Sequence, residues 1–144
     1  NSAELELRKA LALKYSTDSV IPKLANSMLA QGQAKKVVDE FSGVNLTAPV
    51  ATAELQTTLA TAYAILGKSD SAETSLKAAL VAEAGHVPAL LAQARLKAGN
   101  RDFNSAFSLI EDILGKSPNS ADAWKLKGDL FVVAKDDSVR ALEA

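Results

Sequence analysis

A period of 34 to 35 residues runs through the sequence and constrains the fold more than any other feature. The first repeated feature, or marker, is a residue, usually a small one, that begins a series of apolar residues at helical spacing. Its copies, Ala3, Val37, Ala72 and Ala106, lie 34, 35 and 34 residues apart. A second marker is a small residue inside another apolar pattern, with copies 35, 34 and 34 residues apart at Ala25, Ala60, Ala94 and Gly128. Two interleaved markers with one period indicate a chain built from repeated structural units.

Each unit is predicted to be a helical hairpin. Apolar residues around Ala60 have helical spacing, and a second helix is predicted from about Asp70 to Glu83. Gly32 and Gly67 lie between such helices, where glycine supplies the left-handed conformation that ends a helix. We expect the recurring small residues at helix crossings, because a larger side chain there would cost about 1–3 kcal/mol of overpacking.

The sequence resembles the tetratricopeptide-repeat family, whose signature is W-x2-L-G-x2-Y…A-x3-F…P. The matching residues are Trp124, Gly128 and Phe131 for the first half, and Ala106, Ile110 and Pro118 for the second. The resemblance implies an all-α, right-handed superhelical solenoid of helix–turn–helix repeats. It also makes Trp124, the only tryptophan, a packing residue of the repeat rather than part of a ligand site.

The period divides the chain into one array. We assign the second helix of a truncated repeat to 1–17, full repeats to 18–52, 53–86 and 87–120, and a partial repeat to 121–144 whose first helix covers 121–134. The segment from Ser42 to Pro49 lacks helical periodicity, so the second helix before it should be short and a loop should follow. The third repeat has its glycine, Gly99, two residues earlier than the other turns.

The two ends of this array are expected to expose apolar strips. They comprise Leu5, Leu7 and Leu11 at one end and Leu130, Phe131 and Val133 at the other. Burial of apolar surface is worth about 25 cal/mol per Å2. These strips therefore predict homodimerisation or end-to-end association of the chain.

Composition excludes several classes of function. Lys plus Arg number 16 against 17 for Asp plus Glu, and this balance argues against a nucleic-acid partner. No cysteine is present, and no apolar run reaches the ~18 residues of a membrane span. The lone histidine, His86, is predicted to be a solvated turn residue, and the pairs Glu111–Asp112 and Asp136–Asp137 diverge on a helix. We therefore expect no catalytic, metal or cofactor site, and no enzyme.

The first helices of stacked hairpins line a concave groove, which is the predicted binding site for a protein or peptide. By motif alignment the candidate groove residues are Asn26, Thr57, Thr61, Leu91, Arg95, Lys125 and Asp129. In this hypothesis Arg95 and Lys125 contact a carboxylate or backbone carbonyls of the ligand. In the alternative, Lys125 merely pairs with Asp129, for about 0.2–0.5 kcal/mol.

A closer resemblance is to the tetratricopeptide-repeat lipoprotein of the PEP-CTERM/exosortase system of Gram-negative bacteria. Its more diagnostic pieces are the passage Val20-Ile21-Pro22-Lys23-Leu24-Ala25 and the downstream Val37-Val38-Asp39-Glu40. This implies a lipid-anchored envelope protein, on the periplasmic side, associated with exopolysaccharide production and protein sorting, although the lipid-bearing cysteine is absent here. The function expected is a non-catalytic scaffold for protein–protein contacts. The alternatives are a helical platform that contacts polysaccharide or its synthase, and a noncatalytic part of a larger enzyme.

Overall fold

The computed structural model describes residues 2–13 and 16–143, and these residues form an all-α protein. Helices hold 81% of them, and no strand occurs among them, which confirms the predicted all-α class. The chain divides into two compact units, Asn1–Ala89 and Leu90–Ala144, called here the N-terminal and C-terminal units.

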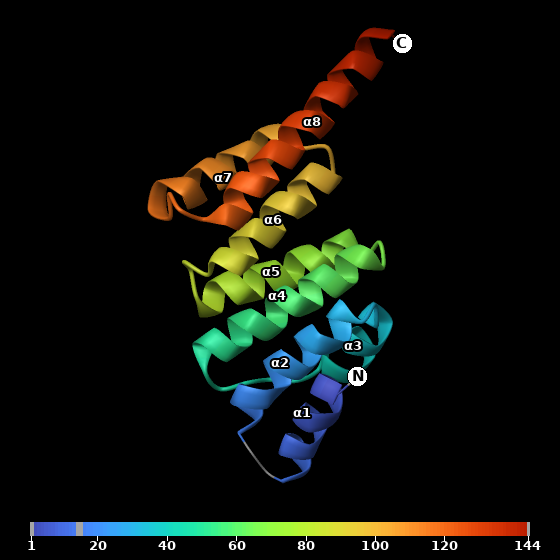
Figure 1. The fold of residues 1–144 in the computed structure, drawn as a ribbon, viewed down its shortest axis with the longest axis vertical. Helices are drawn as coiled ribbons and strands as arrows, with labels where there is room; N and C mark the ends of the chain where they lie inside the picture. The colour runs from blue at the N-terminus through green and yellow to red at the C-terminus, as the bar shows by residue number, and fades with distance from the viewer. Residues whose placement is uncertain (1, 14–15, 144) are drawn as a thin grey trace. The chain divides into compact units, whose positions relative to one another are not determined.

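The N-terminal unit contains five helices in its described residues: α1 (Ser2–Ala12), α2 (Thr17–Ala30), α3 (Ala34–Phe41), α4 (Pro49–Ile65) and α5 (Ser69–Ala82). Each helix packs on its neighbours in the chain or on the next but one: α1 on α2, α2 on α3 and α4, and α4 on α3 and α5 (Figure 1). Within the described part of this unit, α1 reaches neither α4 nor α5, so its helices follow one another in a row.

Apolar residues at helical spacing build the core of this unit. Fully buried side chains come from α2, α3 and α4: Leu24, Met28, Val37, Leu55 and Leu59. Leu7 and Leu11 of α1 pack against this core, whereas Leu5 is exposed. The expected apolar strip at this end is therefore wrong for Leu7 and Leu11, because the face of α1 that carries them is covered by α2.

Glycine ends two of the first helices, as predicted. Gly32 and Gly67 have φ values of 77° and 75°, in the left-handed region. Each turn carries the two hydrogen bonds of a Schellman motif. The Gln33 N–H donates to the Met28 carbonyl (3.1 Å) and the Gly32 N–H to that of Leu29 (2.9 Å). At the second turn the corresponding bonds are from Lys68 to Tyr63 (2.8 Å) and from Gly67 to Ala64 (3.1 Å).

The loop between α3 and α4 confirms the break in helical periodicity after the short α3. However, α4 begins at Pro49, earlier than the predicted start of the repeat at residue 53. Proline in the first turn explains the earlier start, since its fixed φ suits a helix and no N–H is needed there. Asp18 of α2 holds the loop, because its carboxylate accepts hydrogen bonds from the backbone N–H groups of Thr47 (3.0 Å) and Ala48 (3.2 Å) and from the Thr47 hydroxyl.

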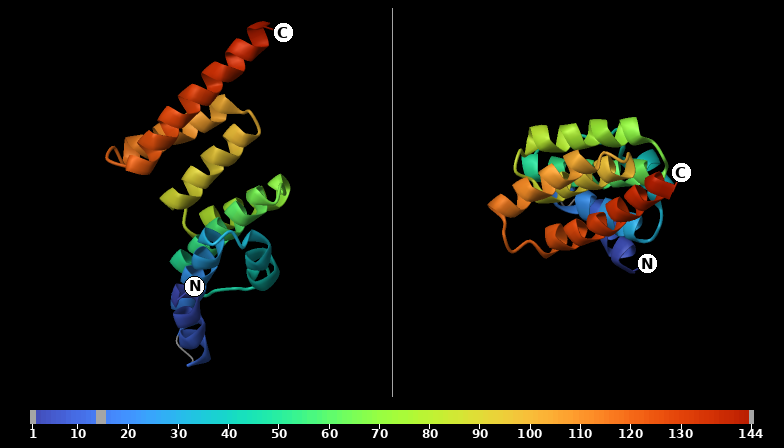
Figure 2. Two further views of the ribbon diagram at one scale, coloured as in Figure 1. Left: turned by 45° about the vertical axis from the view of Figure 1, so that its right-hand side comes forward. Right: turned by 90° about the horizontal axis from the view of Figure 1, so that it is seen from above.

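The C-terminal unit holds most of α6 (Val87–Gly99), together with α7 (Phe103–Lys116) and α8 (Ala121–Glu143). Helices α7 and α8 pack side by side (Figure 2). Arg101 ends α6 in a third turn of the same kind, with φ of 63° and bonds from Asp102 to Lys97 (2.9 Å) and from Arg101 to Ala98 (3.0 Å). Gly99 itself is the last helical residue and does not make this turn.

Helix α8 is a single helix of 23 residues, so the predicted end of a first helix at residue 134 is wrong. The residues that follow, Lys135-Asp136-Asp137-Ser138, include neither glycine nor proline, and none of them has positive φ. Leu130 is buried (4% exposed) and not part of an apolar strip, while Phe131 and Val133 are more than half exposed, as expected.

Candidate functional site

A hollow of about 460 Å3 lies in the N-terminal unit between α2 and α4. Its lining residues come from these two helices and from the segment after α5: Pro22, Lys23, Asn26, Leu29, Glu54, Thr57, Thr58, Thr61, His86 and Pro88. Three predicted groove residues, Asn26, Thr57 and Thr61, therefore line one cavity. Helical spacing places Thr57 and Thr61 on one face of α4, and the packing of α2 on α4 brings Asn26 to the same hollow.

The threonines on the α4 wall use their hydroxyl hydrogens within the helix. Thr57 donates to the carbonyl of Ala53 (2.7 Å), and Thr61 donates to that of Thr57 (3.0 Å). The more deeply buried Thr58 donates in the same way to Glu54 (3.1 Å). A hydroxyl has one hydrogen to donate and two lone pairs. Towards the hollow, the half-buried Thr57 and Thr61 can therefore act only as hydrogen-bond acceptors.

Charged and amide groups complete the walls of the hollow. Lys23 and Asn26 stand on α2 and Glu54 on α4, and all three are exposed. Among the described residues, neither Lys23 nor Glu54 forms an ion pair. The hollow thus presents one cation, one anion and one amide that are available to a ligand.

His86 lies at the end of the hollow, and its side chain is only 10% exposed. The prediction of a solvated turn residue is therefore wrong. The turn before α6 is tight, since the His86 N–H donates to the Glu83 carbonyl (3.2 Å), and it places the ring among the lining residues of the hollow. The His86 Nδ1 atom lies 3.4 Å from Glu83 Oε2, but this contact lacks the geometry of a hydrogen bond. In the described part of the chain, His86 Nε2 and Glu83 Oε2 are both buried without a hydrogen-bond partner.

The remaining candidate groove residues lie in the C-terminal unit. Leu91 is buried (5% exposed), so its assignment as a groove contact is wrong: it shares the apolar face of α6 with Ala94. Arg95, Lys125 and Asp129 are exposed, as predicted. The alternative of a Lys125–Asp129 ion pair does not appear among the ion pairs of the described residues.

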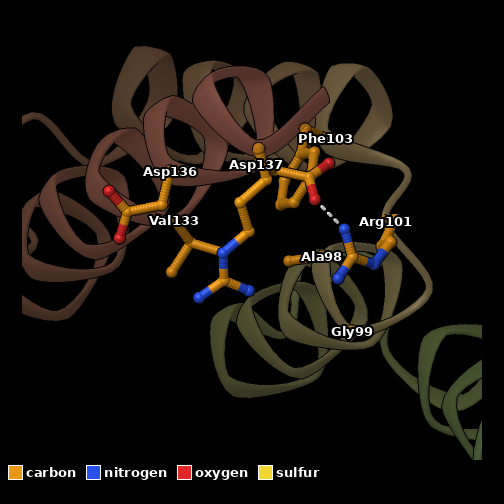
Figure 3. A pocket seen from close by; sticks show the side chains of 8 residues that line it. Ala98, Gly99, Arg101, Phe103, Val133, Asp136 and Asp137 are labelled. Carbon is orange, nitrogen blue, oxygen red and sulfur yellow. Dashed lines mark ion pairs between the residues drawn. The ribbon is translucent and has the colours of Figure 1, made fainter. Parts of the chain in front are cut away.

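A second hollow, of about 360 Å3, lies in the C-terminal unit and is shown in Figure 3. Arg101, from the turn after α6, forms an ion pair there with Asp137 of α8. Asp136 points away from Asp137 in this view, which agrees with the predicted divergence of adjacent carboxylates (Figure 3). This hollow is bridged by an internal ion pair, whereas Lys23 and Glu54 of the hollow between α2 and α4 form no ion pair with any residue that the structure describes.

Trp124 is 53% exposed, so it contributes to packing only locally. Its indole Nε1–H donates to the Pro118 carbonyl (2.8 Å), and the Lys127 Nζ atom lies 5.2 Å from the ring centroid. The ring therefore fixes the turn between α7 and α8 rather than filling the core.

Comparison of the chain with protein-family models, with curated proteins and with solved structures gives no match. Within the described residues, no three side chains of His, Cys, Asp or Glu gather as metal ligands. None of the helices described combines the length and apolar character that crossing a bilayer requires.

Proposed function

We propose that this chain is a non-catalytic scaffold of tetratricopeptide type that binds an extended segment of a partner protein in the hollow between α2 and α4. The observation that carries the proposal is the hollow itself, where Lys23, Asn26 and Glu54 lie exposed on two neighbouring first helices. In the described part of the chain, neither Lys23 nor Glu54 forms an ion pair. A cavity with a few convergent polar groups is the usual form of a recognition site.

Three turns support the repeat assignment. Left-handed residues recur at Gly32, Gly67 and Arg101, 35 and 34 residues apart, each within the same pair of hydrogen bonds. The small residues Ala25, Ala60 and Ala94 have exposed fractions of 0%, 2% and 0%. Stacking of the hairpins into a right-handed superhelix is part of the proposal.

The cell-envelope location and the link to the PEP-CTERM/exosortase system are part of the same proposal, and the sequence resemblance supports them. Cell fractionation of the protein as it is expressed in its own cell is the test. Recovery with envelope membranes, from the periplasmic side, is expected, and recovery with the cytosol would contradict the assignment.

Peptide binding is tested by selecting a ligand from a random peptide library and measuring its affinity by fluorescence anisotropy. Thr61→Arg places a long charged side chain in the hollow and should lower the affinity at least tenfold. Thr74→Arg is the matched control, because Thr74 is an exposed threonine of α5 whose hydroxyl also donates to a carbonyl four residues back (Asp70, 3.0 Å). Equal affinities for the two variants, with unchanged circular dichroism, would refute the proposed site.

The double variant Arg95→Glu/Lys125→Glu examines the predicted groove residues of the C-terminal unit. Both side chains are exposed, so their reversal should leave the fold intact. A peptide selected separately on the C-terminal unit should bind this variant more weakly. Unchanged binding would reject the predicted contacts of Arg95 and Lys125.

A polysaccharide-contacting platform is a second candidate, favoured by the exposed aromatic residues Trp124 and Phe131 of α8. However, successive helical residues point about 100° apart, so these rings lie off the face that carries the predicted groove positions Lys125 and Asp129. The single tryptophan provides the test. An emission shift on addition of exopolysaccharide would favour this second function, and the absence of a shift would favour peptide binding.

A further inference from the structure

We infer that the hollow between α2 and α4 recognises the main-chain N–H groups of an extended peptide, which donate to the hydroxyl oxygens of Thr57 and Thr61. This inference rests on the proposed function and specifies its chemistry. It concerns the backbone of the ligand rather than its side chains.

The first step is the direction of the hydrogen bonds. Thr57 and Thr61 donate their hydroxyl hydrogens to the carbonyls of Ala53 and Thr57, at 2.7 and 3.0 Å. Their remaining lone pairs can therefore accept hydrogen bonds from a donor on the ligand. A peptide backbone supplies such donors at regular intervals, whatever its sequence.

The second step is spacing. Thr57 and Thr61 are four residues apart on one face of α4, which corresponds to a rise of about 6 Å along the helix. In an extended strand, N–H groups on the same edge recur every two residues, about 6.4–6.8 Å apart. A strand running along α4 can therefore present two successive N–H groups of one edge to the two threonines.

The third step is the nature of the surrounding walls. Glu54, one turn before Thr57, adds a carboxylate without an ion pair in the described part of the chain. Together with the hydroxyl oxygens of Thr57 and Thr61, this carboxylate lines the α4 wall with hydrogen-bond acceptors, which suit a ligand rich in N–H donors.

The test combines backbone N-methylation with threonine substitution. A peptide selected from the library is synthesised with a single N-methyl group at each position in turn. One net hydrogen bond corresponds to roughly a fivefold change in affinity. We therefore expect losses of about fivefold at two positions that are two residues apart, and a smaller effect at the position between them.

Thr57→Val and Thr61→Val should each weaken binding by a similar factor, and each should remove the penalty of one N-methyl group. Thr57→Ser and Thr61→Ser keep the hydroxyl and should restore binding. Thr74→Val is the matched control, since it loses the same kind of intrahelical bond outside the hollow. Comparing it with the hollow variants separates loss of the acceptor from loss of helix stability.

The outcomes distinguish the two proposals. If Thr61→Arg abolishes binding but neither N-methylation nor the valine variants change the affinity, the inference is overturned and the proposed function stands. If Thr61→Arg has no effect on peptide binding, the proposed function falls and the inference falls with it.

Discussion

The same substitution, glycine to alanine, should have opposite effects at Gly67 and Gly128. Gly67 has φ of 75° and occupies the turn of a Schellman motif. Gly128 lies inside α8 with ordinary helical geometry. A Cβ atom built at either position meets no atom within 4 Å. Clashes with the rest of the molecule therefore contribute at neither site, and only the local preferences of the backbone remain.

The magnitudes follow from those preferences. An L-residue in the left-handed region costs about 1–2 kcal/mol, and the lower entropy of the unfolded alanine chain offsets about 0.4–1 kcal/mol of this. Gly67→Ala should therefore lower the free energy of unfolding by about 1 kcal/mol. In a helix interior alanine is better than glycine by about 0.8–1.0 kcal/mol. Gly128→Ala should raise the free energy of unfolding by that amount.

Urea denaturation followed by far-UV circular dichroism measures both changes. Gly115→Ala is the control for the helical case, because Gly115 lies in α7 and a Cβ there also meets open space. The reasoning is refuted if Gly67→Ala is as stable as the wild type. It is also refuted if Gly128→Ala is destabilised, since that would mean that a neighbouring group crowds Gly128 in solution.

Three further predictions concern Asp18, Ala60 and Arg8. The hydrogen bond from the Thr47 hydroxyl lowers the pKa of Asp18. The Asp18 carboxylate therefore stabilises the fold above about pH 4, and this stabilisation is lost in acid. Asp18→Asn should lower the melting temperature near neutral pH, with a smaller difference near pH 3. Ala60 is 2% exposed, so Ala60→Leu should cost about 1–3 kcal/mol in urea unfolding. The Arg8 guanidinium donates to both Glu40 carboxylate oxygens (2.8 and 3.0 Å). Arg8→Lys loses this two-bond contact and should lower the free energy of unfolding by less than about 1 kcal/mol. A coupling free energy of zero between Arg8→Lys and Glu40→Gln in a double-mutant cycle would contradict the pairing.

The sequence predicts the elements whose signals are local. Helical periodicity, together with glycine at Gly32 and Gly67, locates the first two turns, and the missing periodicity after Phe41 locates the loop before α4. The placement of Thr57 and Thr61 on one face also follows from spacing, because residues of one helix face recur every three or four positions, whereas Asn26 reaches the same hollow through the packing of α2 on α4.

The parts that the sequence does not predict depend on tertiary context or on weak signals. Arg101 adopts a left-handed conformation that its residue type disfavours, and only its hydrogen bonds identify the turn. A tight turn covers most of the His86 side chain, and nothing in its neighbours along the chain indicates this. Gly128 was expected at a close helix crossing but faces open space, because the helix that carries it continues where the period suggests a turn.

The turn at Arg101 has a higher backbone free energy than the turns at Gly32 and Gly67. All three turns use the same hydrogen bonds, but only Arg101 carries a Cβ atom at positive φ, at a cost of about 1–2 kcal/mol. Local opening should therefore require less free energy at this connection than at Gly32 or Gly67. The amide hydrogen of Asp102 would exchange with solvent deuterium sooner than those of Gln33 and Lys68, so the C-terminal unit would begin to fray from within its own hairpin.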